Sequence, residues 1–530
     1  MKKSTALQNS LEHWRVGAFL LVLLVVFGVY VTRLFILQVV EYPDWLAQSN
    51  ENRTRKINTA APRGIIYDRN GYVLARNIPT YNIVVTPANL PDDPGEIQSI
   101  YRELSALTGV PVNLNEITDQ NPYVPCLSEH GIAQIVTWRE TTSPYEAVKV
   151  ACDVSRDIAM VVEENRGQWP GAGVEIEPIR DYPTGGLTAS IIGFLGPIPA
   201  SEEEYYKDLD FVPNRDKVGY SGVELYFQDQ LAGENGIREV EEDVAGQIIR
   251  DLTAPVIPTP GQNIRLTIDT RLQQAVQTIL LEEINGWNEW YGEIKLTSGS
   301  VVAINPKTGE ILAMVNYPTY ENNRMARIIP AYYYQQLIAD PRNPLLNLAV
   351  GGELPAGSVF KLVTSVGVLN EGVVTPEQII ETPGKITVAE KYYANDPGRS
   401  RDFVDWVYRT QPGGFGQLDF VHAVANSSNV YFYKVGGGYL DEVSPGLGIC
   451  RLGTYARALG YGRLEDGYAG LLPSGYVTPE IELWDKADGL IPDPTWKRNN
   501  QGESWSTGDT YIMSVAKGYA LATPLQLLLT

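Results

Sequence analysis

The residues best suited to covalent chemistry are Ser358 and Lys361, which stand three positions apart. Pro-Ala-Gly at 355–357 precedes them, and a mostly apolar run follows at 362–369. Proline and glycine commonly stand just before a helix, so this pattern predicts a helix with Ser358 in its first turn and Lys361 one turn on. Residues at this spacing share a helix face. A lysine removed from water can be neutral enough to accept the serine proton, so the pair predicts a serine nucleophile with an amine base.

A second serine and lysine, Ser514 and Lys517, have the same spacing. No Pro-Gly pair precedes them, and Gly518 follows where a long apolar helix would be needed. A pattern as short as S-x-x-K is expected about once by chance in a chain of this length. We therefore interpret this second match as fortuitous.

A further element, Ser427-Ser428-Asn429, lies between apolar flanks and predicts a turn that presents a hydroxyl and an amide. The order S-x-x-K and then S-x-N resembles the serine acyl-transferases of the penicillin-binding protein and β-lactamase superfamily, which carry K-T-G on a strand as a third element. The resemblance implies that Ser358 is the acylated nucleophile and Lys361 its general base. It makes Ser427 a proton relay to the leaving group and Asn429 a hydrogen-bonding partner of the substrate backbone. It also implies an oxyanion site at the Ser358 N–H and an N–H of the K-T-G strand.

The Lys-Thr-Gly at 307–309 matches the third element but lies before Ser358, on the wrong side. The β-rich runs around it, joined by Asn, Pro and Gly, predict a plain hairpin turn. Residues 519–526 resemble the segment that shortly precedes the K-T-G strand in the family, and the chain ends at Thr530. We therefore expect a fragment, or a product truncated at its C-terminus, that acylates penicillin little or not at all because an oxyanion donor is missing.

A transmembrane anchor is predicted at 16–40. Residues 16–32 are uncharged and mostly apolar, and apolar character resumes at 34–40, which together is long enough to span a bilayer with snorkelling ends. Basic residues before this stretch place the N-terminus in the cytoplasm and the bulk of the chain outside. The alternative is a cleaved signal peptide. It is disfavoured because the apolar stretch exceeds the usual ~7–15 residues and no clear small-x-small cleavage site follows.

Composition excludes several classes of partner. The chain has 42 Lys and Arg against 63 Asp and Glu, a net charge of −21, which argues against nucleic acid or an anionic lipid surface. The cysteines and histidines have no metal-ligand spacing, so we predict no metal and no cofactor. Three cysteines allow at most one disulfide, and the sequence leaves its pairing open. The cysteines are Cys126, Cys152 and Cys450, and the histidines are His13, His130 and His422.

Other segments narrow the resemblance to class B penicillin-binding proteins, which crosslink cell-wall peptides and have no glycosyltransferase domain of their own. Residues 61–71, Ala-Pro-Arg-Gly-Ile-Ile-Tyr-Asp-Arg-Asn-Gly, resemble the R-G-x-I-x-D-R-N-G box that begins their non-catalytic module. An insert rich in Pro, Asn, Asp and Glu, together with 489–492 and 505–510, resembles the elongation-type members, with the division type as the alternative. The further segments that fit the class lie at 170–178, 192–196, 219–226, 239–242 and 246–250.

The resemblance implies an α+β fold in which the nucleophile helix packs behind an antiparallel sheet. A Pro-rich break at 258–261 marks the last domain boundary, and after it Leu272, Val276, Ile279 and Leu280 predict one apolar helix face. The expected parts are a cytoplasmic tail at 1–15, the transmembrane anchor at 16–40, a β-rich elongated pedestal or dimerisation module at 41–262 with a head insert at about 85–172, and a penicillin-binding/β-lactamase-like transpeptidase domain at 263–530, incomplete at its C-terminus.

The segment 390–416, between the two serine elements, is aromatic and charged. It predicts either a cover over the site or a solvated loop, and we assign it no substrate contact. Ser428 stands where some relatives carry cysteine or aspartate, a difference that we expect to be tolerated.

The activity that the resemblance implies is acyl transfer at the outer face of a cytoplasmic membrane. Ser358 would attack the D-Ala-D-Ala amide of a peptidoglycan stem peptide, D-alanine would leave, and an amine of a neighbouring stem would take the acyl group. β-Lactams would acylate the same serine, and the partner would be a glycan polymerase of the shape, elongation, division and sporulation (SEDS) family. The alternatives are a non-catalytic scaffold or activator of that polymerase, and a β-lactam sensor or hydrolase.

Overall fold

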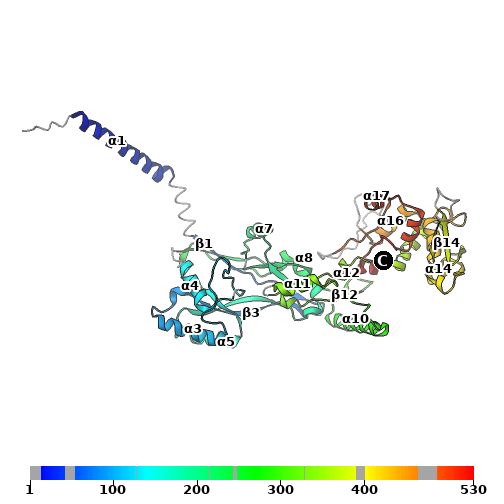
Figure 1. The fold of residues 1–530 in the computed structure, drawn as a ribbon, viewed down its shortest axis with the longest axis horizontal. Coiled ribbons are helices and arrows are strands. Elements are labelled where there is room, and N and C mark those ends of the chain that lie inside the picture. The colour runs from blue at the N-terminus through cyan, green and yellow to red at the C-terminus, as the bar shows by residue number, and fades with distance from the viewer. Residues whose placement is uncertain are drawn as a thin grey trace, which may run out of the picture. The chain divides into compact units, whose positions relative to one another are not determined.

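The computed structural model of the chain describes residues 13–41, 54–127, 129–213, 215–242, 248–326, 329–389, 400–462 and 486–530. Helices and strands are mixed along the chain (Figure 1), which confirms the predicted α+β class. The chain divides into two compact units. The first comprises Met1–Ala61, Pro79–Pro178 and Glu234–Thr259, and the second comprises Pro62–Ile78, Ile179–Gly233 and Pro260–Thr530.

Helix α1 (His13–Phe35) continues into a five-residue π-helix at Ile36–Val40. Within the described residues, Gly17–Val40 is the one helix long and apolar enough to cross a membrane. Its large side chains are exposed, Phe19 by 66% and Leu24 by 69%, and a bilayer would cover such a surface. The span expected at 16–40 is therefore present as a helix of sufficient length and apolar character.

The first unit holds a three-stranded antiparallel sheet and a separate helix-covered core. The sheet has the order β1 (Thr54–Thr59), β8 (Gly236–Glu242), β9 (Ile248–Asp251). The core is one buried cluster of residues between Ile83 and Ala172, so the residues expected as a head insert share a single core. Its elements are the end of β3 (Val73–Val85), β4 (Val148–Val154), β5 (Ala172–Asp181), α3 (Pro94–Thr108), α4 (Ile132–Thr142) and α5 (Arg156–Glu164).

A disulfide joins Cys126 to Cys152 in the same unit, with 5.5 Å between their Cα atoms. Cys152 lies on β4, and Cys126 lies in the loop before α4. The Tyr123 hydroxyl in the same loop donates to the Lys149 carbonyl on β4 at 2.7 Å. The loop is thus fastened to the strand at two points. Cys450 is a free and exposed thiol, so the pairing that the sequence left open is Cys126 with Cys152.

The second unit contains short strands and most of the helices. Apart from the parallel contact of β2 with β10, its described strand pairs are antiparallel. The strands are β2 (Ile66–Tyr67), β6 (Leu195–Pro197), β7 (Lys217–Gly219), β10 (Ile264–Arg265), β11 (Gly299–Ile304), β12 (Ile311–Tyr317), β13 (Ile380–Thr382), β14 (Lys385–Ala389), β15 (Ser400–Val404) and β16 (Gly416–Leu418). The helices are α6 (Ala189–Ile192), α7 (Glu203–Asp208), α8 (Gly222–Tyr226), α9 (Gln228–Ala232), α10 (Thr270–Tyr291), α11 (Ala331–Ala339), α12 (Leu348–Gly351), α13 (Lys361–Asn370), α14 (Phe420–Ala425), α15 (Asn429–Gly437), α16 (Ile449–Ala458), α17 (Pro494–Gln501), α18 (Thr507–Ser514) and α19 (Pro524–Leu529).

Helix α13 is the predicted nucleophile helix, and it lies inside the largest buried cluster of the unit. Phe360, Val363 and Val368 have no exposed surface, and the Phe360 ring meets the edge of Tyr461 at 5.3 Å between centroids. The apolar run at 362–369 therefore forms the helix that the sequence predicts. Its described neighbours include helices α15 and α16, and the short strands β13 and β15 pack against α15.

Helix α10 packs on strand β12 through a polar side chain. Gln273 is fully buried, and its side-chain amide donates to the Met314 carbonyl and accepts from the Met314 N–H, both at 2.8 Å. Ile284 is buried on the same helix, whereas Leu272 and Ile279 are exposed by 36% and 57%. The predicted apolar face is therefore wrong at Leu272 and Ile279. A side-chain amide can form hydrogen bonds with the backbone N–H and carbonyl groups of β12, which a leucine cannot do.

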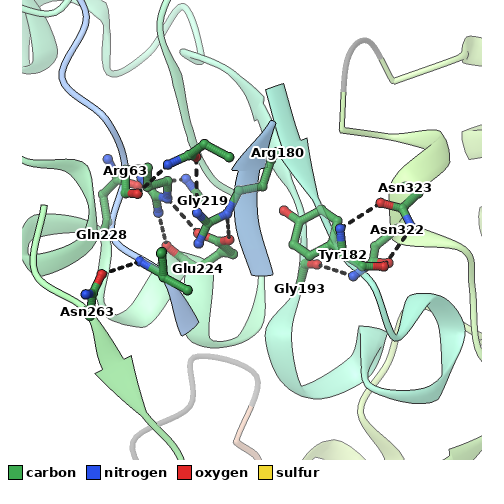
Figure 2. A network of polar contacts seen from close by, with 12 residues as sticks. Arg63, Arg180, Tyr182, Gly193, Gly219, Glu224, Gln228, Asn263, Asn322 and Asn323 are labelled. Carbon is green, nitrogen blue, oxygen red and sulfur yellow. Dashed lines mark hydrogen bonds and ion pairs between the residues drawn. The ribbon is translucent and has the colours of Figure 1, made fainter. Parts of the chain in front are cut away.

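Figure 2 shows a buried ion triad in the second unit, in which Glu224 lies between Arg63 and Arg180. The Nε atoms of Arg63 and Arg180 donate to the two Glu224 oxygens at 2.6 and 2.7 Å. Burial raises the pKa of Glu224, but the two arginine charges outweigh it and hold this pKa below its ordinary value. Arg63 belongs to the box at 61–71 and Glu224 to the segment at 219–226, so two separate sequence signatures meet here.

Replacing Glu224 by Gln should lower the free energy of unfolding by about 3–5 kcal/mol, because two buried guanidinium groups lose their counter-ion. The matched control is Glu203→Gln, which removes an ion pair with Lys207 at 2.6 Å whose side chains are 41% and 54% exposed. That change should cost no more than about 1 kcal/mol. Urea unfolding followed by tryptophan fluorescence measures both, and equal losses would contradict the expectation.

Candidate active site

Ser358 lies in a single 3-10 turn, Gly357–Phe360, that leads directly into α13. Gly357 has φ +61°, a left-handed conformation that glycine adopts without strain. Its N–H donates to the Ala516 carbonyl at 3.1 Å, which ties the turn to the end of α18. Phe360 anchors the turn in the buried core, whereas Ser358 is exposed. The Ser358 hydroxyl forms no hydrogen bond with any described residue. The predicted nucleophile is thus rigidly held and unengaged.

Lys361 is the first residue of α13, and its side chain points inward with only 4% exposure. The ammonium donates three hydrogen bonds to oxygen atoms of the S-x-N element. The acceptors are the Ser427 carbonyl at 2.6 Å, the Ser427 hydroxyl at 3.0 Å and the Asn429 side-chain oxygen at 2.8 Å. Two elements that lie 66 residues apart in the chain therefore meet at one nitrogen atom.

Burial lowers the pKa of Lys361 from 10.5 to about 8. The Asp405 charge acts in the opposite direction, and the Lys517 charge lowers the pKa further. All three acceptors of the ammonium are uncharged oxygens, so among the residues that the structure describes no ion pair holds the group in its protonated form. A neutral amine is therefore accessible near physiological pH, which is the state that a general base needs.

Ser427 occupies the turn between α14 and α15 with φ +50°, a conformation that is rare for a residue with a side chain. The turn is held by its own backbone, since the Ser427 N–H donates to Val424 at 3.0 Å and the Ser428 N–H donates to Ala423 at 3.1 Å. Asn429 begins α15 and is buried, with 3% of its surface exposed. This geometry directs both the carbonyl and the hydroxyl of Ser427 at the lysine.

Asp405 is a residue of this site that the sequence reasoning missed. It is 2% exposed, and its Oδ2 accepts from the Ser428 hydroxyl at 2.7 Å and from the Val430 N–H at 3.0 Å. Its Oδ1 accepts from the Trp406 N–H at 2.7 Å. Ser428, expected to be only tolerated, therefore links this carboxylate to the S-x-N turn. No spacing pattern in the sequence marks Asp405. The segment that contains it is predicted to be either a cover over the site or a solvated loop.

The segment 390–416 is described from residue 400 onward, so most of its predicted charged and aromatic part lies outside the described residues. Trp406 is 62% exposed, and its indole N–H donates to the Asn426 carbonyl at 3.1 Å, directly before the S-x-N element. Arg401 lies over the Phe403 ring at 5.2 Å. The described part of this segment is thus a support of the S-x-N turn.

The two competing sequence matches differ clearly from Ser358 and Lys361. Ser514 has no exposed surface, and its hydroxyl donates to the Tyr511 carbonyl of its own helix at 2.7 Å. The Lys-Thr-Gly at 307–309 forms the turn of the antiparallel hairpin β11–β12, with Gly309 at φ +76°. Ser514 is therefore no nucleophile, and the predicted hairpin is confirmed.

Two family models match the chain. Residues 58–266 match the penicillin-binding protein dimerisation domain, and residues 299–528 match the penicillin-binding protein transpeptidase domain, which includes every site residue described above. The peptidoglycan D,D-transpeptidase MrdA of Escherichia coli K12 is 29% identical over 514 residues, which cover 96% of this chain and 70% of that protein. The chain belongs to the class B penicillin-binding proteins of the elongation type. The predicted family is thereby confirmed.

Other relatives of this class B protein agree. MrdA of Haemophilus influenzae is 29% identical over 96% of this chain and 68% of its own length. A solved chain from a peptidoglycan synthase complex is 26% identical, with a TM-score of 0.60 over 97% of this chain and 76% of that one. The Helicobacter pylori penicillin-binding protein PBP2, solved in complex with MreC, is similar in fold at 22% identity, with a TM-score of 0.66 over 89% of this chain and 75% of that one.

Replacing Asp405 by Asn should lower the free energy of unfolding by about 1–3 kcal/mol, because either orientation of the amide turns its NH2 group toward a backbone N–H, of Val430 or of Trp406. The matched control is Asp402→Asn in the same segment, whose exposed carboxylate pairs with Lys385. The control should lose far less. Urea midpoints compare the two, and a control as damaging as Asp405→Asn would refute the supporting role.

Proposed function

We propose that this class B penicillin-binding protein is a peptidoglycan D,D-transpeptidase that crosslinks stem peptides during cell elongation. The observation that carries the proposal is the buried ammonium of Lys361, which Ser427 and Asn429 hold one turn from the exposed hydroxyl of Ser358. Burial lowers the pKa of this ammonium to about 8. Its relatives named MrdA are peptidoglycan D,D-transpeptidases, which gives the reaction its substrate class.

In the first step the Ser358 oxygen attacks the carbonyl carbon of the D-Ala-D-Ala amide, and neutral Lys361 accepts the hydroxyl proton. The C–N bond breaks, the acyl group stays on Ser358 as an ester, and D-alanine leaves with a proton on its nitrogen. Ser427 is suited to relay that proton, because its hydroxyl already lies 3.0 Å from the Lys361 nitrogen. The Ser358 N–H is the oxyanion donor that this chain supplies.

In the second step an amine of a neighbouring stem peptide attacks the Ser358 ester. Lys361 and Ser427 take the amine proton and return it to the serine oxygen, so the enzyme is regenerated and a new amide crosslink forms. Asn429 holds the lysine through its side-chain oxygen at 2.8 Å, which leaves its NH2 group to bind the substrate backbone. A β-lactam would enter at the first step and remain on Ser358.

The same proposal includes the cellular setting. Helix α1 would anchor the chain in the cytoplasmic membrane as a single span, with the N-terminus inside and the modules at 41–262 and 263–530 outside. A glycan polymerase of the SEDS family would be the partner, since a similar chain was solved in a peptidoglycan synthase complex that coordinates polymerization and crosslinking.

Fluorescent penicillin tests the nucleophile. The full-length protein in its native membranes should be labelled, Ser358→Ala should lose the label completely, and Ser514→Ala should keep it. Each variant removes the serine hydroxyl from one of the two S-x-x-K matches. Alanine is smaller than serine, so it fits at the buried position of Ser514. A folded native protein that stays unlabelled would sink the proposal and favour a non-catalytic scaffold.

The rate of penicillin acylation should rise with pH around a midpoint of about 8, because only neutral Lys361 accepts the serine proton. In Asp405→Asn the midpoint should move to lower pH, since the carboxylate charge that raises the Lys361 pKa is gone. Asp402→Asn should leave the midpoint in place. Stopped-flow measurement of the acylation rate between about pH 5.5 and 9.5 tests this expectation. A rate that does not change with pH would rule out Lys361 as the base.

A further inference from the structure

The buried ion triad of Figure 2 holds more positive than negative charge. The guanidinium groups of Arg63 and Arg180 share the single carboxylate of Glu224, and these side chains are exposed by 8%, 1% and 0%. Among the described residues no second carboxylate pairs with either arginine. One positive charge is therefore in excess, and a buried charge is costly unless a counter-ion accompanies it.

Arg180 also has a hydrogen-bond donor to spare. Its Nε donates to Glu224 at 2.7 Å and its Nη1 donates to the Asn77 side-chain oxygen at 3.2 Å. Its Nη2 is buried and has no hydrogen-bond partner among the described residues. Because a guanidinium is planar and rigid, this free Nη2 group stays close to the Glu224 carboxylate.

Gln228 holds a second unpaired donor beside the triad. Its side-chain oxygen accepts from the Gly219 N–H at 2.9 Å, whereas its side-chain nitrogen is buried without a partner in the described part of the chain. Gly219 packs on Glu224 so closely that a Cβ atom there would lie 2.1 Å from the Glu224 carbonyl oxygen. Arg63 donates to that same carbonyl at 2.8 Å. The free NH2 group of Gln228 is thus fixed next to the backbone that holds Arg63.

The third donor is the Tyr182 hydroxyl, which has no exposed surface and no partner within the described residues. Figure 2 shows this hydroxyl pointing toward Arg180 and Glu224. Burial raises the pKa of Tyr182 well above its ordinary value, and the Glu224 charge raises it further, so the hydroxyl keeps its proton. Asn322 has an unpaired buried oxygen, but it lies beyond the Tyr182 ring, where its NH2 group donates to Gly193 at 3.2 Å.

We propose that Arg180, Gln228 and Tyr182 bind a single small monovalent anion of the size of chloride. A buried water molecule would also accept from these donors, but it brings two hydrogen atoms that need acceptors of their own. A halide ion accepts hydrogen bonds, brings no hydrogen atom, and balances the excess guanidinium charge. Excess charge and excess donors therefore both favour an anion over water. This site is independent of the proposed acyl transfer.

Thermal unfolding in different salts tests the site. The full-length protein in detergent is heated in chloride, bromide or gluconate at equal ionic strength, because gluconate is too large for a buried halide site. The unfolding midpoint should rise with chloride or bromide and then level off, since an ion that binds only the folded state stabilises it. Tyr182→Phe should raise the halide concentration of half effect about 10-fold or more, because one hydrogen bond to a charged group is lost. A midpoint that does not depend on halide would overturn the proposal.

Gln228→Glu provides the sharpest variant. It keeps an oxygen for the Gly219 N–H and places a carboxylate of the chain itself beside the unpaired donors. The halide dependence should disappear, and the midpoint in gluconate should exceed that of the native protein. Gln230→Glu, an exposed change on the same helix α9, should keep the halide dependence. Equal halide dependence in the two variants would contradict the proposal, and so would a lower midpoint of Gln228→Glu in gluconate.

Bromide also allows a direct observation that needs no variant. Crystals of the protein grown in bromide should show an anomalous scattering peak within hydrogen-bond distance of the Arg180 Nη2 atom. Ordered water at that position, without an anomalous peak, would overturn the proposal.

Discussion

The site depends on one buried ammonium that is solvated by neutral oxygen atoms. The Lys361 ammonium is buried away from water and donates hydrogen bonds to two oxygens of Ser427 and one of Asn429. The same chain shows the opposite arrangement at Glu224, where two arginines contact one carboxylate and hold its pKa low. A buried charge with a contacting counter-ion is fixed and serves structure, whereas one with neutral partners can lose its proton. That difference suits Glu224 to holding the module together and Lys361 to moving protons.

A chain of hydrogen bonds sets the position of those oxygens. Asp405 accepts from Ser428 and Val430, which flank Asn429, and so fixes the start of α15 and the turn before it. Within the described residues no ion pair joins Asp405 to Lys361, so the carboxylate raises the lysine pKa from a distance without neutralising it. One group thereby places the acceptors and limits how far burial depresses the pKa. A direct ion pair would have cost the lysine its role as a base.

The sequence predicts the parts of this site that obey local rules. The Pro-Ala-Gly start and the apolar run predict α13, and the family order of S-x-x-K and S-x-N predicts four residues, three of which the structure joins by hydrogen bonds. Asp405 escapes prediction because Ser428 and Val430, the partners that tie it to the site, lie 23 and 25 residues away and no periodicity links them to it. Gln273 defeats the expected face of α10 for a related reason, since the backbone groups that it satisfies belong to β12. Likewise, the pairing of Cys126 with Cys152 follows from how one loop folds onto β4.

The net charge of the chain and the single charges at the site act on the substrate over different distances. The chain carries a net charge of −21, so its average field repels a substrate that ends in a carboxylate. Salt screens that field over about 8–10 Å, and within this range single groups decide what binds. Lys361 cannot attract the carboxylate and also act as a neutral base in the same step.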